Sequence, residues 1–289
     1  ASVIAQFLLL NRNSLSQTIL SSDFSDLRDL SRQRESLVDQ MSSTKSEIKR
    51  LLTMTFPELE HISGLFSKSM LRLLCQYPSA ASIKQAKRSK IAKILIPGSY
   101  GKQTDLSVDR ILKAAQASVG TSSATKEIIL RQKASLLIQL EEHLQELTDT
   151  LIELCQGKIQ GDMDILTSMK GIGEKTAMNF LIEMGGDIKQ FESHKKLIAM
   201  AGLDPALYQS GKTDRKGKIS KRGNRHLRRV IWLMATKVIQ FNERFKQYYL
   251  KRIKDGLPYK KAVLATAHKL ARVMFAMLRN KTLFDARMN

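Results

Sequence analysis

The sequence predicts an all-α protein, and three observations lead to this. Two long stretches carry apolar residues at alternating steps of three and four, the spacing of one helix face. No stretch alternates apolar and polar residues for long enough to require a sheet. The chain has 289 residues, of which 43% are hydrophobic, enough for cores in about two domains.

Each helical stretch presents a narrow apolar seam. Six of eight seam positions are apolar in the first stretch and seven of eight in the second. Such seams predict coiled-coil helices, paired antiparallel within the chain or with a second copy. Two surface helices on a globular bundle remain the alternative. The seams are Leu27, Leu30, Arg34, Leu37, Met41, Thr44, Ile48 and Leu51, then Leu130, Lys133, Leu137, Leu140, Leu144, Leu147, Leu151 and Leu154.

The segment between the seams, residues 55–125, is interrupted by prolines and glycines and predicts several short helices. A second change comes after Leu154, where Gly157 and Gly161 mark a break. We therefore expect a coiled-coil and linker region over residues 23–160 and a separate helical domain over residues 161–289.

The charge balance indicates a polyanionic partner. Lys and Arg total 48 against 27 Asp and Glu, a net charge of +21, so nucleic acid is expected first and an anionic membrane surface second. The apolar run from Val3 to Leu10 is too short to span a bilayer. Cys75 and Cys155 form no metal-ligand pair, so the residues themselves predict no cofactor, and a reducing cytoplasm is the expected compartment.

Residues 166–177 predict a helix-hairpin-helix element. Gly171 and Gly173 allow a tight turn, and the amides that open the next helix can meet a phosphate, with Lys170 and Lys175 on either side. Such a contact would hold the nucleic-acid backbone without reading sequence. A tight turn with incidental lysines is the alternative.

A second motif, residues 202–229, is strongly basic. Nine Lys or Arg and one acid, Asp214, lie between Ser210 and Arg229. Three glycines within residues 211–223 predict a basic loop there, and Asn224 predicts a helix N-cap. The cations expected to bind phosphate here are Lys212, Arg215, Lys218, Lys221, Arg222, Arg225 and Arg228.

Ser210 lies inside this basic field. A serine hydroxyl attacks phosphorus only when a base or surrounding positive charge activates it, and Ser-Gly alone is more typical of a turn. His226 is the histidine closest in sequence, and it is a base, a phosphate donor or merely a solvated side chain. Trp232 is expected in the core. The basic C-terminal helices, residues 244–287, either contact nucleic acid or form a solvated face.

These strings together resemble the C-terminal domain of the IS110 family of insertion-sequence transposases, relatives of the pilin-gene invertases. The resemblance rests on Gly171-Ile-Gly173, on the Ala201–Pro205 and Tyr208–Lys212 segments, and on Ile219–Asn224. It implies a DNA transposase or recombinase in which Ser210 is the nucleophile that links to DNA. It also implies bacterial origin, homo-oligomers (dimers or tetramers) joined by the coiled coils, and in some members a guiding bridge RNA.

One departure from the family pattern concerns its acidic half. Members begin with a RuvC-like domain whose four acidic residues bind a divalent metal such as Mg²⁺. Residues 1–22 resemble only the end of that domain, and Asp23, Asp26 and Asp29 are spaced as acids that favour a helix start. We therefore expect a chain that lacks the metal-binding domain and is inactive alone. A non-catalytic nucleic-acid-binding or assembly module, left from a transposase, is the alternative.

Overall fold

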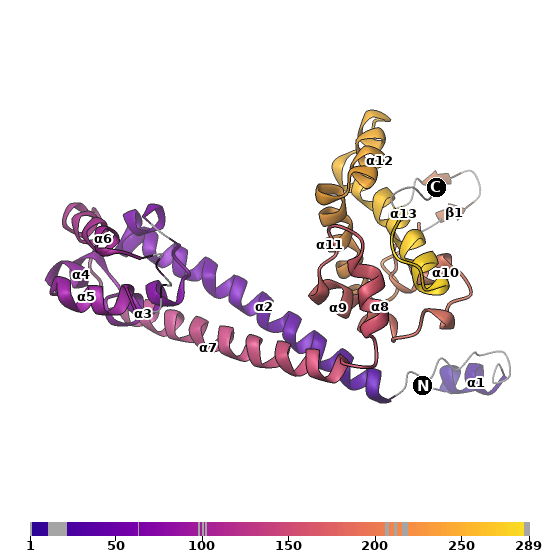
Figure 1. Ribbon diagram of the computed structural model, residues 1–289, viewed down its shortest axis with the longest axis horizontal. Helices are drawn as coiled ribbons and strands as arrows, with labels where there is room; N and C mark the ends of the chain where they lie inside the picture. Colours follow the sequence, from indigo (N-terminus) through magenta and orange to yellow (C-terminus); the bar gives the residue numbers. More distant parts are fainter. Residues whose placement is uncertain are drawn as a thin grey trace. The chain divides into compact units, whose positions relative to one another are not determined.

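The computed structural model describes residues 2–10 and 22–285, except for residues 63, 98, 100, 102, 206, 207, 211, 212 and 216–218. The chain folds as two compact units, one made of Ala1–Arg32 and Leu151–Asn289 and the other of Gln33–Thr150. Figure 1 shows the helices of both units. These compact units divide the chain after Arg32 and before Leu151. The domain boundary near Gly161 stays a prediction.

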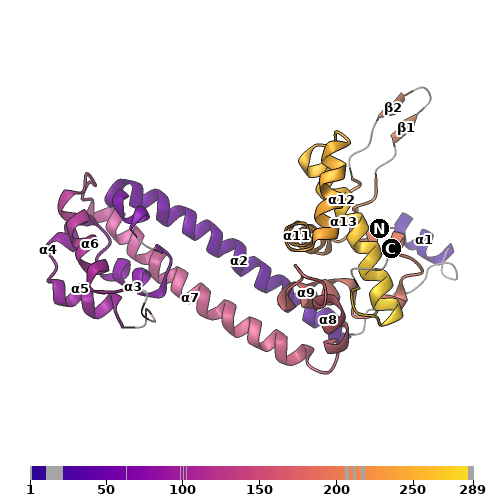
Figure 2. The same cartoon turned by 45° about the horizontal axis from the view of Figure 1, so that its top comes forward.

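The second unit is organised by the paired helices α2 (Ser22–Thr55) and α7 (Ala124–Cys155). Lys45 pairs with Glu141 at 3.9 Å and Glu47 with Lys133 at 2.6 Å. Partner numbers fall along α7 as they rise along α2, so the helices run antiparallel, and both views show them side by side (Figures 1 and 2). The pairing therefore lies within the chain.

The predicted seams match the buried faces of these helices over most of their length. The seam residues Leu37, Ile48 and Leu51 of α2 are buried, as are Leu130 and Leu137 of α7. The second seam departs from the prediction at its end, where Leu154 is 45% exposed and Cys155 is buried instead. A straight helix has 3.6 residues per turn, so its buried stripe drifts by about 20° per heptad relative to a strict 3.5 repeat.

The short helices predicted between the seams are present. They are η1 (Pro57–His61), α3 (Lys68–Gln76), α4 (Ala80–Gln85), α5 (Arg88–Leu95) and α6 (Asp105–Ala117). Serine and threonine begin several of them: Ser67 caps α3, and Ser79 and Thr104 form capping boxes. Their apolar faces join those of α2 and α7 in one core.

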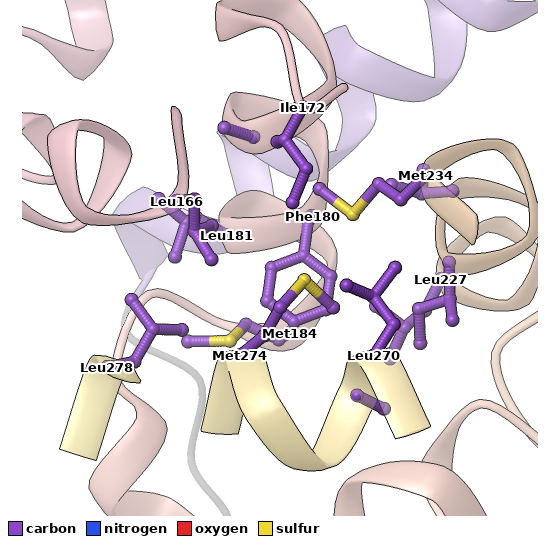
Figure 3. Packing of buried hydrophobic residues seen from close by; sticks show 14 of the residues in the cluster. Leu166, Ile172, Phe180, Leu181, Met184, Leu227, Met234, Leu270, Met274 and Leu278 are labelled. Carbon is purple, nitrogen blue, oxygen red and sulfur yellow. The ribbon is translucent and has the colours of Figure 1, made fainter. Parts of the chain in front are cut away.

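The first unit holds α8 (Gln160–Thr167), α9 (Glu174–Met184), η2 (Ile188–Gln190) and α10 (His194–Met200). It also holds α11 (Arg225–Phe241), α12 (Glu243–Lys254) and α13 (Tyr259–Asn280). Side chains from α8, α9, α11 and α13 interdigitate around Phe180 (Figure 3). A further helix, α1 (Ser2–Leu10), opens the chain.

The all-α prediction is confirmed, with one local correction. Residues 211–223 were expected as a loop, but β1 (Tyr208–Ser210) and β2 (Thr213–Arg215) pair as an antiparallel hairpin. The hairpin is too short for an alternating pattern to reveal it. Within the described ranges, the helices lack the length or the apolar character that crossing a membrane requires.

Candidate nucleic-acid interface

Ser210 lies at the turn end of the hairpin. In the register of the two strands, Tyr208 faces Arg215 and Ser210 faces Thr213. Ser210 is the last residue of β1, and the bridge between Pro205 and Ile219 lies before the start of that strand. Two of the predicted phosphate-binding residues, Lys212 and Lys218, lie outside the described residues.

The hairpin grows from a root in which two motif segments, residues 200–205 and 219–224, pair through their backbones. The amides of Ser220, Lys221 and Asn224 donate to the carbonyls of Asp204, Gly202 and Met200 at 2.8, 3.1 and 2.7 Å. Ser220 Oγ also donates to Asp204 Oδ1 at 2.7 Å. The two strings that carry the motif in the sequence are therefore the two sides of one structure.

Two glycines permit this close pairing. Gly202 has φ +62°, and a Cβ there would come within 2.4 Å of the Arg222 carbonyl oxygen. Gly223 has φ +120°, and its Cβ would come equally close, 2.4 Å, to the carbonyl oxygen of Met200. Both positions need a residue that lacks a side chain and tolerates positive φ.

Asn224 connects the root to α11. Its Oδ1 accepts the amides of His226 and Leu227 at 2.9 and 3.1 Å, which confirms the predicted N-cap. Its Nδ2 donates to Oε2 of Glu183 on α9 at 2.6 Å. Glu183 is only 2% exposed and also pairs with Arg32 at 3.1 Å. The start of α11 is thus fixed by a buried, charged anchor.

Beside the root lies a groove of about 910 Å³. Six of its lining residues are cations, and none of the described residues that line it is a carboxylate. The groove therefore has the charge that a phosphate backbone requires. Its cations are Lys221, Arg225, Arg228, Arg229, Lys260 and Lys261, and its other lining residues are Leu203, Pro205, Ile219, Trp232, Leu264, Ala265 and His268.

The groove brings together only some of the residues that the sequence indicated. Lys221, Arg225 and Arg228 line it, while Arg222 is exposed nearby in the chain without lining it. Sequence reasoning missed Arg229 and the pair Lys260 and Lys261 from α13.

Trp232, expected in the core, is half-buried: it packs against the edge of the core and also lines the groove. Together with Arg225, Arg228 and Arg229 it follows the spacing of one helix face, which was a signal available in the sequence. The opposite face of α11, which includes Leu227, is buried as predicted.

The predicted helix-hairpin-helix turn joins α8 to α9 and does not line the groove. Gly171 has φ +104°, and a Cβ there would lie 2.8 Å from the carbonyl oxygen of Lys237 on α11, so this glycine allows close packing. Gly173 caps α9 and has open space beside it. Lys170 and Lys175 are exposed on either side, which leaves the turn accessible to a phosphate.

Two family models match the chain. Residues 163–250 match a model described as "Transposase IS116/IS110/IS902 family". Residues 1–57 match a model described as "Transposase", for the DEDD type of IS110. The first match contains the hairpin, its root and all of α11, and the second contains α1 and α2.

Several curated proteins are similar to this chain. An uncharacterized 43.6 kDa protein of insertion element IS110 from Streptomyces coelicolor is 29% identical over 88% of this chain and 63% of its own length. A pilin gene-inverting protein from Moraxella bovis is 26% identical over 55% of this chain and 48% of its own. A transposase for insertion sequence element IS1111A from Coxiella burnetii is 31% identical over 42% and 34%. The chain spans less than two thirds of the length of the relatives with the strongest matches.

The expectation that the chain lacks the acidic transposase domain is wrong, because residues 1–57 match the DEDD model. The error has a physical reason. The family pattern implies an α/β domain with clustered acids, whereas the described part of the matched segment is helical, with its acids placed along α2.

The DEDD match implies a divalent metal. We tested this against the carboxylates of α2, from Asp26 to Glu47. They span roughly 30 Å at 1.5 Å per residue, and Glu47 pairs with Lys133. Among the described residues, no three His, Cys, Asp or Glu side chains come together at metal-binding distance. These carboxylates do not fit a metal site.

Proposed function

Because two segments of the chain match models of IS110-type transposases, we propose that it is a DNA transposase or site-specific recombinase of that family. In this proposal Ser210 attacks a DNA phosphodiester. The cations of the neighbouring groove hold the phosphate backbone of the same strand at the base of the hairpin.

One observation carries the proposal: the hairpin of Ser210 and the cationic groove share the same root. Pro205 and Ile219 pair where the hairpin begins, and both line the groove. Lys221 belongs to the root and is also a groove cation. A nucleic-acid strand held in the groove therefore lies next to the base of the hairpin that bears the serine.

The proposed step is a transesterification. Ser210 Oγ forms a bond to phosphorus, and the bond from phosphorus to one deoxyribose oxygen breaks. The serine proton passes to a base, and the departing oxygen takes up a proton to become a free hydroxyl. The product is a phosphoserine ester, so the energy of the broken bond is conserved for rejoining to another strand.

Several cations support this chemistry by their position. Lys221, Arg225 and Arg228 lie along the root and the first turns of α11. Positive charge fixed in place at the root binds the phosphates of the strand that the serine attacks. Lys170, Lys175 and the amides after Gly173 provide a second, separate contact to a DNA backbone.

DNA is the partner that follows from the family, and two further partners belong to the proposal. One is a second copy of the chain, in a dimer or tetramer. The other is a guide RNA, for which the net charge of +21 leaves ample capacity. Such a protein would act where bacterial DNA lies, in the cytoplasm at the nucleoid.

The nucleophile is tested with a suicide DNA substrate that traps the covalent intermediate, incubated with Mg²⁺. We expect a protein–DNA adduct with the unaltered chain and none with Ser210→Ala. Thr213→Val is the matched control, because Thr213 is the register partner of Ser210 in the hairpin and also bears a hydroxyl group. It should keep the adduct.

Adduct that persists in Ser210→Ala would exclude this serine as the nucleophile. If the unaltered chain binds DNA with a steep salt dependence and forms no adduct, it is a binding or assembly module without chemistry of its own.

A further inference from the structure

We propose that the groove between α11, α13 and the hairpin root holds an unpaired nucleotide, with its base stacked on Trp232. The inference rests on the proposed function for its occupant, a nucleic acid, and it specifies the form in which that nucleic acid binds. It makes Trp232 a positioning residue next to the reacting strand.

The groove is lined by both cationic and apolar side chains. Phosphates alone would be served by its six cations, yet the groove is also lined by an indole ring and by the apolar side chains of Leu203, Pro205 and Leu264. A ligand that contacts both the cations and the apolar side chains has a negative charge and a flat apolar face, as a nucleotide does.

The arrangement on α11 places both contacts on one wall. Arg225, Arg228 and Trp232 stand at steps of three and four, so they share one face of the helix. The span from the first to the last is roughly 10 Å at 1.5 Å per residue. A strand that meets the arginines with its phosphates can thus reach the tryptophan with a base.

The opposite wall is fixed in position by a hydrogen bond. Nε2 of His268 on α13 lies 3.0 Å from the carbonyl oxygen of Leu203 in the root. Arg228 on α11 donates to the carbonyl of the nearby Ala201 at 2.9 Å. Both helices are therefore tied to the same root, and the groove is formed before a ligand arrives.

A paired duplex fits this groove less well than an unpaired strand. Bases in a duplex are stacked on one another, and only phosphates and groove edges are offered to a protein. The indole would then remain without a stacking partner. Stacking of a base on an aromatic ring is insensitive to sequence, because every base has a π face.

Intrinsic fluorescence tests the inference directly, because Trp232 is the only tryptophan of the chain. The unaltered protein is titrated with single-stranded oligothymidylate, with an abasic oligomer of equal length and with a blunt duplex. We expect the thymidylate to quench the emission. The abasic oligomer should bind with a similar salt dependence and quench little, and the duplex should likewise quench little.

A parallel titration with oligouridylate identifies which strand occupies the groove. Quenching by the DNA oligomer assigns the site to a DNA strand, and quenching by the RNA oligomer alone assigns it to RNA. The inference is overturned if the abasic oligomer quenches as much as the thymidylate, or if single strands bind and leave the emission unchanged.

Variants give a second measurement. Trp232→Leu should weaken binding of the thymidylate about tenfold and leave that of the abasic oligomer unchanged, while Trp232→Phe retains most of the affinity. Phe241→Leu is the control, since Phe241 is 56% exposed on the same helix and does not line the groove. Ser210→Ala should abolish the adduct and preserve the quenching, so failure of the nucleophile and failure of the base site give different results.

Discussion

Ser220 donates a hydrogen bond from Oγ to Oδ1 of Asp204 at 2.7 Å, and this contact closes the root of the hairpin that carries Ser210. The amide of Ser220 donates to the carbonyl of the same aspartate at 2.8 Å. The segments that enter and leave the hairpin are thus joined twice between the same two residues. The position of the hairpin beside the groove depends on this pair.

Removing the hydroxyl should loosen the root without unfolding the unit. We expect Ser220→Ala to cost about 0.5–1.5 kcal/mol in the free energy of unfolding and to slow adduct formation, since the hairpin is held less firmly. Thermal unfolding and single-turnover adduct formation measure the two effects. Asp204→Asn keeps an acceptor oxygen and should stay closer to the unaltered protein. Equal rates in all three proteins would show that the contact does not position the hairpin.

The close approach of the two root segments makes Gly202 sensitive to any side chain. In Gly202→Ala the new Cβ collides with the Arg222 carbonyl, in addition to the strain of positive φ. Gly256→Ala is the matched control, because Gly256 has φ +84° with open space around it and suffers the strain alone. We expect a loss of about 1–2 kcal/mol for Gly256→Ala and about 1–3 kcal/mol more for Gly202→Ala, by chemical denaturation. Similar losses of stability in the two variants would mean that the root relaxes to accommodate the new Cβ.

The buried carboxylate of Glu183 should be essential for stability. It pairs with Arg28 and Arg32 and accepts from Asn224, so Glu183→Ala removes the carboxylate from the mostly buried Arg28 and from the amide of Asn224. We expect a loss of about 3–5 kcal/mol. Glu243→Gln, which removes an exposed pair with Lys246, should cost less than about 1 kcal/mol. Comparable stabilities for the two variants would contradict the role given to Glu183.

Stability should also depend on the protonation of His194. Burial lowers the pKa of His194 below its ordinary value of 6.5, and the charges of Arg272 and Lys195 lower it further. The unfolded chain therefore takes up a proton at a higher pH than the folded protein does. The free energy of unfolding should fall as the pH decreases below about 6.5, and less steeply in His194→Gln. Parallel pH profiles for the two proteins would rule out this histidine as the source.

Local signals in the sequence account for much of the fold. The seam containing Leu37 and Ile48 identified the pairing face of α2, and Asn224 identified the start of α11, because both depend on residues within a few turns. The hairpin escaped prediction since it depends on pairing between Pro205 and Ile219, fourteen positions apart with no alternating pattern between them.

Only part of the candidate site could be predicted from the sequence, for a similar reason. The basic string pointed to Lys221, Arg225 and Arg228, but Lys260 and Lys261 reach the same groove from α13, which is distant in sequence. Trp232 was assigned to the core because α11 carries apolar residues on one face and groove residues on the other. The spacing of Trp232 from Arg225 and Arg228 already places it on the groove face, opposite Leu227.

The central claim, that Ser210 forms the bond to DNA, is tested most directly by locating the modified residue by mass spectrometry. Tryptic cleavage after Lys196 and Lys212 yields one peptide that contains Ser210 together with a single other hydroxyl, that of Tyr208. After nuclease digestion of the trapped adduct, we predict a nucleotide attached to Ser210 in the fragment spectrum of that peptide. A nucleotide on Tyr208, or on a different peptide, would contradict the account.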